Sequence, residues 1–134
     1  MRAGGVELRV GLSSCGVASG GEAVRDALAK EAGGRAVVKA VGCNGMCHCE
    51  PIVQVVEPGK PVALYGNVTT EAAREIARRH TRRGAVAAAG RVVRVLRGRP
   101  VVELLDHRVD VEAGPAAAYL GKQKRIVLEN CGEI

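Results

Sequence analysis

The chain has almost no aromatic side chains from which to build a core. Phe and Trp are absent from its 134 residues, and Tyr65 and Tyr119 are the aromatic residues, although 47% of the residues are hydrophobic. The core must therefore consist of Val, Ala, Leu and Ile, which suits a β-rich sheet covered by alanine-rich helices. The length gives room for one domain and a short appendage, because domains cluster near about 100–150 residues.

Patterned apolar segments follow one another in a regular order over the first 84 residues. Runs rich in β-branched residues indicate strands, and apolar residues at helical spacing indicate helices. The expected strands are 7–12, 36–41, 52–56 and 62–65, and the expected helices are 22–31 and 71–82. A Pro-Gly pair between the last two strands favours a turn, so these strands should form an antiparallel hairpin.

The order strand, helix, strand, strand, strand, helix predicts an α/β fold with a thioredoxin-like mixed sheet (β-α-β-β-β-α). The first strand, helix and second strand should form a right-handed crossover, which makes these two strands parallel, and the hairpin should extend the sheet antiparallel. Beyond Gly84 the chain has small residues and then valines with scattered arginines. We expect residues 85–121 to form an extended connector, with a possible β-hairpin that turns at residues 98–100.

The cysteines are concentrated in two loops that should lie at one edge of the sheet. Cys43, Cys47 and Cys49 fall within seven residues just after the second strand, and Cys15 follows the first strand. Because the two strands are parallel, their carboxyl ends open at the same edge, which brings four thiols within reach of one site. A [2Fe–2S] cluster needs four thiolates, so these four cysteines are the predicted metal ligands.

Other interpretations of the cysteine loop stay open on this reasoning. Zinc is the first rival, because Cys-x3-Cys falls within zinc spacing and His48 could serve as a ligand, although a domain with its own core does not need a zinc knuckle. A third interpretation is that no metal binds and that Cys49 is a partly buried thiol. A redox dithiol is disfavoured, since no Cys-x-x-Cys pair is present. Cys131 is expected to be structural.

The formal net charge is +6 with histidine counted as neutral, and four arginines and one histidine cluster between residues 78 and 83. This cluster lacks the interleaved aromatic side chains on which bases stack, so we expect a solvated helix end and no nucleic-acid partner. No run approaches the about 18 apolar residues of a membrane helix, and no signal-peptide pattern opens the chain. We expect a cytoplasmic protein without direct membrane insertion.

Two stretches resemble a known family, the NADH-binding flavoprotein subunit of respiratory complex I and its relatives in soluble NAD-dependent hydrogenases and formate dehydrogenases. Residues 14–20, which include Cys15, and residues 42–53 look like the cluster loops of that family's N-terminal thioredoxin-like [2Fe–2S] ferredoxin domain. The order and spacing of elements agree along residues 6–84. Residues 122–134 are similar to the segment that leads into the family's flavin and NADH domain.

The resemblance implies three parts: a thioredoxin-like ferredoxin domain (1–84), a connector (85–121) and the start of a truncated flavin- and NADH-binding domain (122–134). The implied function is electron transfer by an iron–sulfur domain of an NADH-oxidising FMN flavoprotein subunit, with other subunits of a redox complex as partners. FMN, NAD and a [4Fe–4S] cluster are expected only in the parent chain beyond Ile134. This fragment alone should have no catalytic residues.

One departure from the family concerns the first cysteine loop. The family usually presents a Cys-x4-Cys pair there, and counting back from Cys15 leads to Val10. Cys43 and Cys47 match the second pair of the family, and Cys49 is an addition. The alternative function is therefore a cluster-free thioredoxin-like module that docks or assembles subunits of the same complex.

Overall fold

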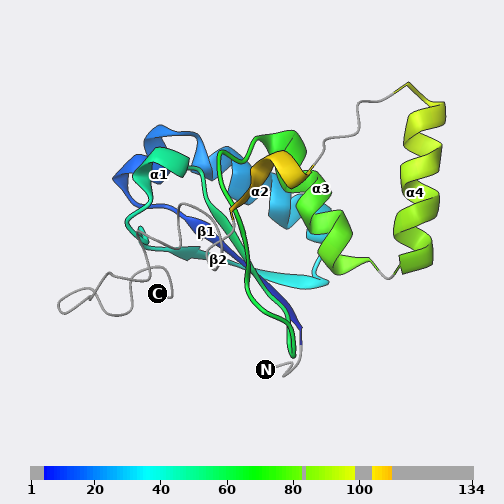
Figure 1. Cartoon of the computed structure of the whole chain (residues 1–134), viewed down its shortest axis with the longest axis horizontal. Helices are drawn as coiled ribbons and strands as arrows, with labels where there is room; N and C mark the ends of the chain where they lie inside the picture. The colour runs from blue at the N-terminus through cyan, green and yellow to red at the C-terminus, as the bar shows by residue number, and fades with distance from the viewer. Residues whose placement is uncertain (1–4, 83, 99–103, 110–134) are drawn as a thin grey trace.

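The computed structural model describes residues 5–82, 84–98 and 104–109. Within them lie five strands and four α-helices (Figure 1). The strands are β1 (Val6–Gly11), β2 (Ala36–Val41), β3 (Val53–Val56), β4 (Ala63–Tyr65) and β5 (Arg108–Val109). The helices are α1 (Ser14–Ala18), α2 (Gly21–Ala32), α3 (Thr70–Thr81) and α4 (Gly84–Leu96), and the 3₁₀ turns are η1 (Cys47–Cys49) and η2 (Leu104–His107).

The five strands form one mixed sheet in the order β2-β1-β3-β4-β5. Strands β1 and β2 are parallel, with Val6 opposite Ala36 and Gly11 opposite Val41. The pairs β1–β3, β3–β4 and β4–β5 are antiparallel. The parallel pair joined through α2, followed by an antiparallel hairpin and α3, confirms the predicted thioredoxin-like α/β sheet.

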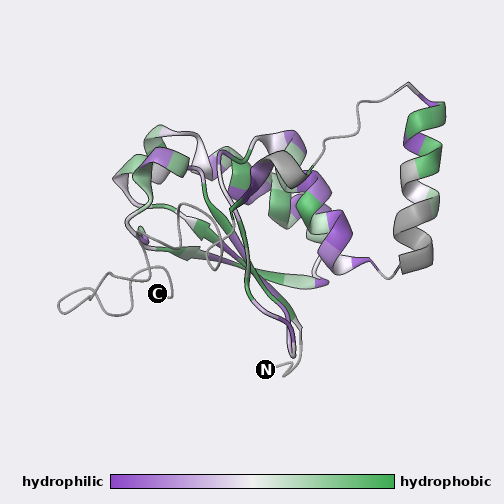
Figure 2. Cartoon of the chain, viewed as in Figure 1, coloured by the Kyte–Doolittle hydropathy of each residue, from purple (hydrophilic) through white to green (hydrophobic). Residues whose placement is uncertain are grey.

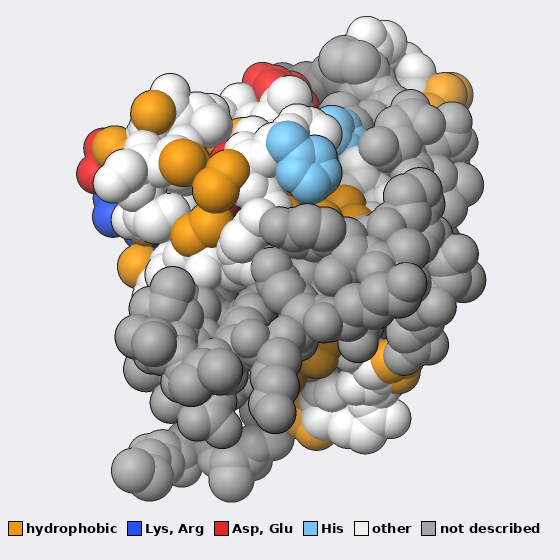
Figure 3. All heavy atoms as spheres, turned by 60° about the vertical axis from the view of Figure 1, so that its left-hand side comes forward, with side chains coloured by type: hydrophobic (Ala, Val, Ile, Leu, Met, Phe, Trp, Pro, Cys, Tyr) orange, Lys and Arg blue, Asp and Glu red, His pale blue; other side chains and the backbone are white. Residues whose placement is uncertain are grey.

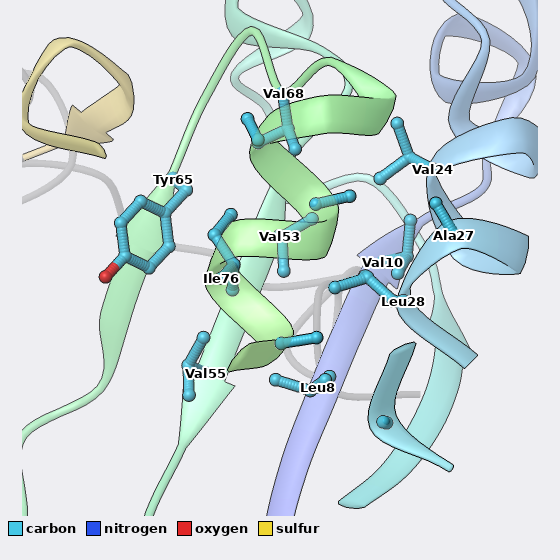
Figure 4. Close-up of a cluster of buried hydrophobic side chains, with 14 of the residues drawn as sticks. Leu8, Val10, Val24, Ala27, Leu28, Val53, Val55, Tyr65, Val68 and Ile76 are labelled. Atoms are coloured by element: carbon cyan, nitrogen blue, oxygen red, sulfur yellow. The ribbon is translucent and has the colours of Figure 1, made fainter. Parts of the chain in front are cut away.

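The core lies between the sheet and the helices α2 and α3, which pack together on one of its faces (Figures 1 and 4). Alternate residues of β1 and β3 point into it, and so does the apolar side of each helix, as their helical spacing requires. Its fully buried members include Leu8, Val10, Val24, Leu28, Val53, Val55 and Ile76. Aliphatic side chains therefore fill this core, as the composition predicts.

Helix α4 occupies the first part of the segment that we expected to be an extended connector. Ala, Leu and Arg are favourable in helices, and Arg94 donates a hydrogen bond to Glu75 of α3 at 2.6 Å. This ion pair links α4 to α3, and the local sequence of either helix does not predict it. The first arm of the possible hairpin is thus helical, and the residues of the segment from 104 to 109 add η2 and the edge strand β5. The predicted part 122–134 lies outside the described residues.

Helix α4 stands apart from the sheet, beyond the end of α3 (Figure 1). Figure 2 shows hydrophobic residues toward the Leu96 end of α4 and hydrophilic ones on the C-terminal part of α3. Among the described residues no helix is both long enough and apolar enough to cross a membrane.

Candidate metal-binding site

Both cysteine loops leave the sheet at the same edge. Strands β1 and β2 end opposite each other at Gly11 and Val41, and the amide of Leu12 donates to the Val41 carbonyl at 2.9 Å. The chain then continues into α1 from one strand and into the loop before η1 from the other (Figure 1). The parallel pairing thus produces the juxtaposition of loops that the sequence predicts.

Cys43 and Cys47 lie side by side in the second loop. Their Sγ atoms are 3.5 Å apart, and the amide of Gly45 donates to Cys43 Sγ at 3.2 Å. Gly45 has a φ of 93°, which lets the chain turn between the two cysteines. Two thiolates bound at about 2.3 Å to one tetrahedral metal are about 3.8 Å apart. The pair is therefore spaced to bind a single metal ion.

Burial raises the pKa of the partly buried Cys43 thiol, and the Gly45 amide opposes that shift by donating to the sulfur. The neighbouring Cys47 raises the same pKa, and the Ser13 hydroxyl lowers it slightly. A raised pKa keeps a thiol protonated at neutral pH, so a metal ion binding here would displace the proton.

Cys15 lies in α1 and is exposed. The helix packs tightly on the end of β1, because a Cβ atom at Gly16 would lie 2.2 Å from the Gly11 carbonyl oxygen. Helix α1 and η1 lie at the same end of the molecule (Figure 1). Figure 3 shows that end, where hydrophobic side chains, a class that includes cysteine in that view, gather on the surface.

Cys49 has apolar surroundings. It packs against a small apolar cluster formed by Met46, Ile52 and Leu64, and its Cβ would be 3.0 Å from a Cβ placed on Gly66. Burial, with a smaller effect of the neighbouring glutamate, raises the pKa of its thiol. The structure therefore pairs two of the four predicted ligands and leaves Cys49 in an apolar setting. In the part of the chain that the structure describes, no three residues of the His, Cys, Asp or Glu types are grouped to hold a metal ion.

Glu50 is a buried carboxylate at this edge that the sequence reasoning missed. It is 7% exposed, and its Oε2 accepts a hydrogen bond from the Ile52 amide at 2.9 Å. Its Oε1 lies 2.9 Å from where a Cβ on Gly11 would be, so it fills the space beside the end of β1. Burial raises the pKa of Glu50, and the Ile52 amide opposes that shift. The position of this acidic residue between the cysteine cluster and an apolar strand was the sequence signal that could have indicated its burial.

Val10, the position that the family spacing gives for the missing cysteine, is fully buried in the core. A side chain there points away from the loops, whereas Gly11 is the residue at the strand end. His48, the possible zinc ligand, is exposed, and Cys131 lies outside the described residues.

These features define a class: a thioredoxin-like domain that carries a close pair of cysteines at the carboxyl edge of its parallel strands. The fold is similar to that of a thioredoxin-like [2Fe–2S] ferredoxin from Aquifex aeolicus, with a TM-score of 0.53 and 19% identity over 81% of this chain and 93% of that one. No protein-family model matches the chain.

In sequence the chain is 31% identical over 87 residues to HndB, a subunit of the NADP-reducing hydrogenase of Solidesulfovibrio fructosivorans. The match covers 62% of this chain and 69% of that protein. The chain belongs to the family of this hydrogenase subunit. Together with the fold, this relationship confirms the predicted resemblance to the thioredoxin-like ferredoxin domains of hydrogenase-type subunits.

Proposed function

We propose that the chain is an electron-transfer domain that binds a [2Fe–2S] cluster within a multi-subunit oxidoreductase. The observation that carries the proposal is the pair of Cys43 and Cys47, with sulfur atoms 3.5 Å apart, at the edge of a thioredoxin-like sheet. The similar solved structure is a [2Fe–2S] ferredoxin, and the relative in sequence is a hydrogenase subunit.

The residues at the site fit such a cluster in their donor chemistry. Cys43 and Cys47 would hold one iron, Cys15 would be a further ligand, and the Gly45 amide is already aimed at a ligand sulfur at 3.2 Å. A [2Fe–2S] cluster, when bound, takes up and releases a single electron. The Gly45 amide would stabilise negative charge on Cys43, and the buried Met46 beside the pair would limit access of water. Cys49 stays a predicted ligand without support from its packing.

A finer proposal concerns the complex. The resemblance of residues 122–134 to the entry of a flavin and NADH domain supports an NADH-oxidising FMN flavoprotein as the parent chain. FMN, NAD and a [4Fe–4S] cluster would then lie beyond Ile134, and other subunits of the cytoplasmic redox complex would be the electron donor or acceptor. Purification of the native complex and identification of its subunits and flavin would test this assignment.

The test of the cluster is a measurement of iron, zinc and acid-labile sulfide per chain after anaerobic purification and reconstitution. We expect iron and sulfide at one [2Fe–2S] cluster per chain, with visible absorption that bleaches when dithionite is added. The variant Cys43→Ala should lose the iron and keep its far-ultraviolet circular dichroism. A folded wild-type chain that binds zinc, or that binds neither iron nor sulfide, would contradict the proposal.

A docking role has support of its own in helix α4. Val92, Val95 and Leu96 lie on one face of the helix at positions i, i+3 and i+4, and they are 58%, 60% and 80% exposed. Helix α4 is linked to α3 by the hydrogen bond from Arg94 to Glu75. Exposed apolar side chains of this size commonly mark a protein interface.

The partner that fits this face is another subunit of the complex with an apolar groove and an acidic rim. A second copy of this chain fits poorly, because each copy carries a net charge of +6 and exposed arginines such as Arg97 beside the apolar face. In the purified complex, Leu96→Glu should release the chain without changing its iron content, and Arg74→Glu on exposed α3 should not. Retention of Leu96→Glu in the complex, or a stable homodimer that this change dissociates, would contradict the assignment.

A further inference from the structure

The cysteine site contains a buried hydroxyl without a hydrogen-bond partner. Ser13 Oγ is the side-chain oxygen or nitrogen atom that is buried and unpaired among the residues that the structure describes. An unpaired buried polar group is unfavourable, so such an atom in a folded protein calls for an explanation, for example a bound ion. Ser13 lies two residues before Cys15, in the loop that leaves β1.

The position of Ser13 makes the unpaired hydroxyl more informative. Ser13 is the N-cap residue of α1, with a φ of −74° and a ψ of −179°. A serine at that position usually accepts a hydrogen bond from an amide of the first turn. Ser13 makes no such bond through its side chain, although its carbonyl accepts from the Val17 amide at 2.9 Å. The hydroxyl is therefore not used to begin the helix.

Ser13 lies in the loop that adjoins the loop of the cysteine pair. Its hydroxyl makes no hydrogen bond with any of the residues that the structure describes. Ser13 belongs to the β1 loop and Cys43 to the β2 loop, and the backbone bond from Leu12 to Val41 holds the two loops together at 2.9 Å. Ser13 is thus located where the two cysteine loops meet.

A [2Fe–2S] cluster needs four protein ligands, and Cys15, Cys43 and Cys47 would supply three of them. Cys49 packs against the apolar cluster of Met46, Ile52 and Leu64. Cysteine is not the only ligand that such clusters use, because histidines replace two cysteines on one iron in Rieske centres. A serine oxygen is a harder donor than a thiolate and suits ferric iron.

We propose that Ser13 Oγ is the fourth ligand of the cluster, together with Cys15, Cys43 and Cys47. The proposal rests on the proposed function, because it requires that a [2Fe–2S] cluster is bound. On coordination the hydroxyl releases its proton to solvent as the oxygen–iron bond forms, so the ligand carries the same single negative charge as a thiolate. A harder anionic donor stabilises the ferric state, so this ligand should lower the reduction potential relative to four thiolates.

The test compares four variants after anaerobic reconstitution: Ser13→Ala, Ser13→Cys, Cys49→Ala and, as a matched control on the exposed neighbour, Ser14→Ala. Iron and sulfide per chain, visible absorption, the electron paramagnetic resonance signal after dithionite, and the reduction potential are measured for each. Circular dichroism reports folding independently of the cluster.

We expect Ser13→Ala to lose the cluster, with a decrease in iron retention larger than the about 10–100-fold that removal of an outer-shell partner costs. Ser13→Cys should keep the full iron and sulfide content, with altered absorption bands and a higher reduction potential. Cys49→Ala and Ser14→Ala should resemble the wild type. If Ser13→Ala does not fold, Ser13→Cys still decides, because an unchanged spectrum and potential in that variant would overturn the proposal.

The outcomes separate the ligand proposal from the function on which it rests. A wild-type chain without iron and sulfide would overturn both. A wild-type cluster that Ser13→Ala leaves intact would overturn the ligand proposal alone, and a shift of potential in that variant would then identify the hydroxyl as a hydrogen-bond donor. Loss of the cluster in Cys49→Ala would identify Cys49 as the fourth ligand and would also overturn the ligand proposal.

Discussion

Replacing Gly16 by alanine probes the close packing of α1 against the end of β1. A Cβ atom at this position would lie 2.2 Å from the Gly11 carbonyl oxygen and 2.8 Å from its carbonyl carbon. Both are backbone atoms, so the helix or the strand end must move. Overpacking of this kind costs about 1–3 kcal/mol, and the higher helix propensity of alanine offsets about 0.8–1 kcal/mol of that cost. The free energy of unfolding should therefore fall by up to roughly 2 kcal/mol.

Gly90 in α4 is the matched control for this substitution. The nearest heavy atom to a Cβ placed there is Nη1 of Arg82, at 4.0 Å, so alanine has room and should stabilise the helix by about 0.5–1 kcal/mol. Urea unfolding followed by circular dichroism measures both variants. Because Gly16 adjoins Cys15, the destabilised variant should also lose iron faster. If Gly16→Ala and Gly90→Ala stabilise the protein equally, the close contact between α1 and β1 is refuted.

Three further predictions concern the fold around the site. Burial lowers the pKa of His80 below its ordinary value of 6.5, although its bond to Glu57 opposes that shift. Protonation of His80 is therefore less favourable in the folded protein than in the unfolded chain. The stabilising contribution of neutral His80 to the free energy of unfolding should be fully present above about pH 6.5 and should be lost as the pH falls below it. Urea midpoints measured above and below that pH should show the loss, and His80→Gln should show less of it. Glu31 accepts two hydrogen bonds of 2.9 Å from one arginine of α3, so Glu31→Gln should lower the free energy of unfolding by about 1–2 kcal/mol, whereas Asp26→Asn in an exposed pair should change it by less than about 1 kcal/mol. Leu28→Ala, at a fully buried position, should cost about 2–5 kcal/mol in the same assay.

The domain fold could be predicted because its signals are local. The apolar spacing of residues 22–31 gives α2 to within a residue at each end, and the Pro-Gly turn gives the hairpin of β3 and β4. Helix α4 and the two-residue strand β5 could not be predicted in this way. Valines and arginines suit either a strand or a helix, and both elements are fixed by contacts with α3 and β4 that are distant in sequence.

The candidate site divides along the same line. Parallel pairing of β1 and β2 brings both cysteine loops to one edge, and spacing along the chain is enough to predict it. The spacing of the cysteines along the chain does not determine the direction of the Cys49 side chain. The 3₁₀ turn η1 has three residues per turn, so Cys49 cannot face the same side as Cys47 two residues earlier. Cys49 packs against an apolar cluster instead.

The sequence by itself determined the order of the elements, the aliphatic core and the edge of the sheet at which the thiols emerge, because these follow from local periodicity and strand direction. The tertiary structure alone decided which side chains meet at that edge: the close sulfur atoms of Cys43 and Cys47, the unpaired Ser13 hydroxyl and the buried Glu50 carboxylate. Such contacts depend on the direction of each side chain in a loop, and no repeating pattern in the sequence encodes that direction.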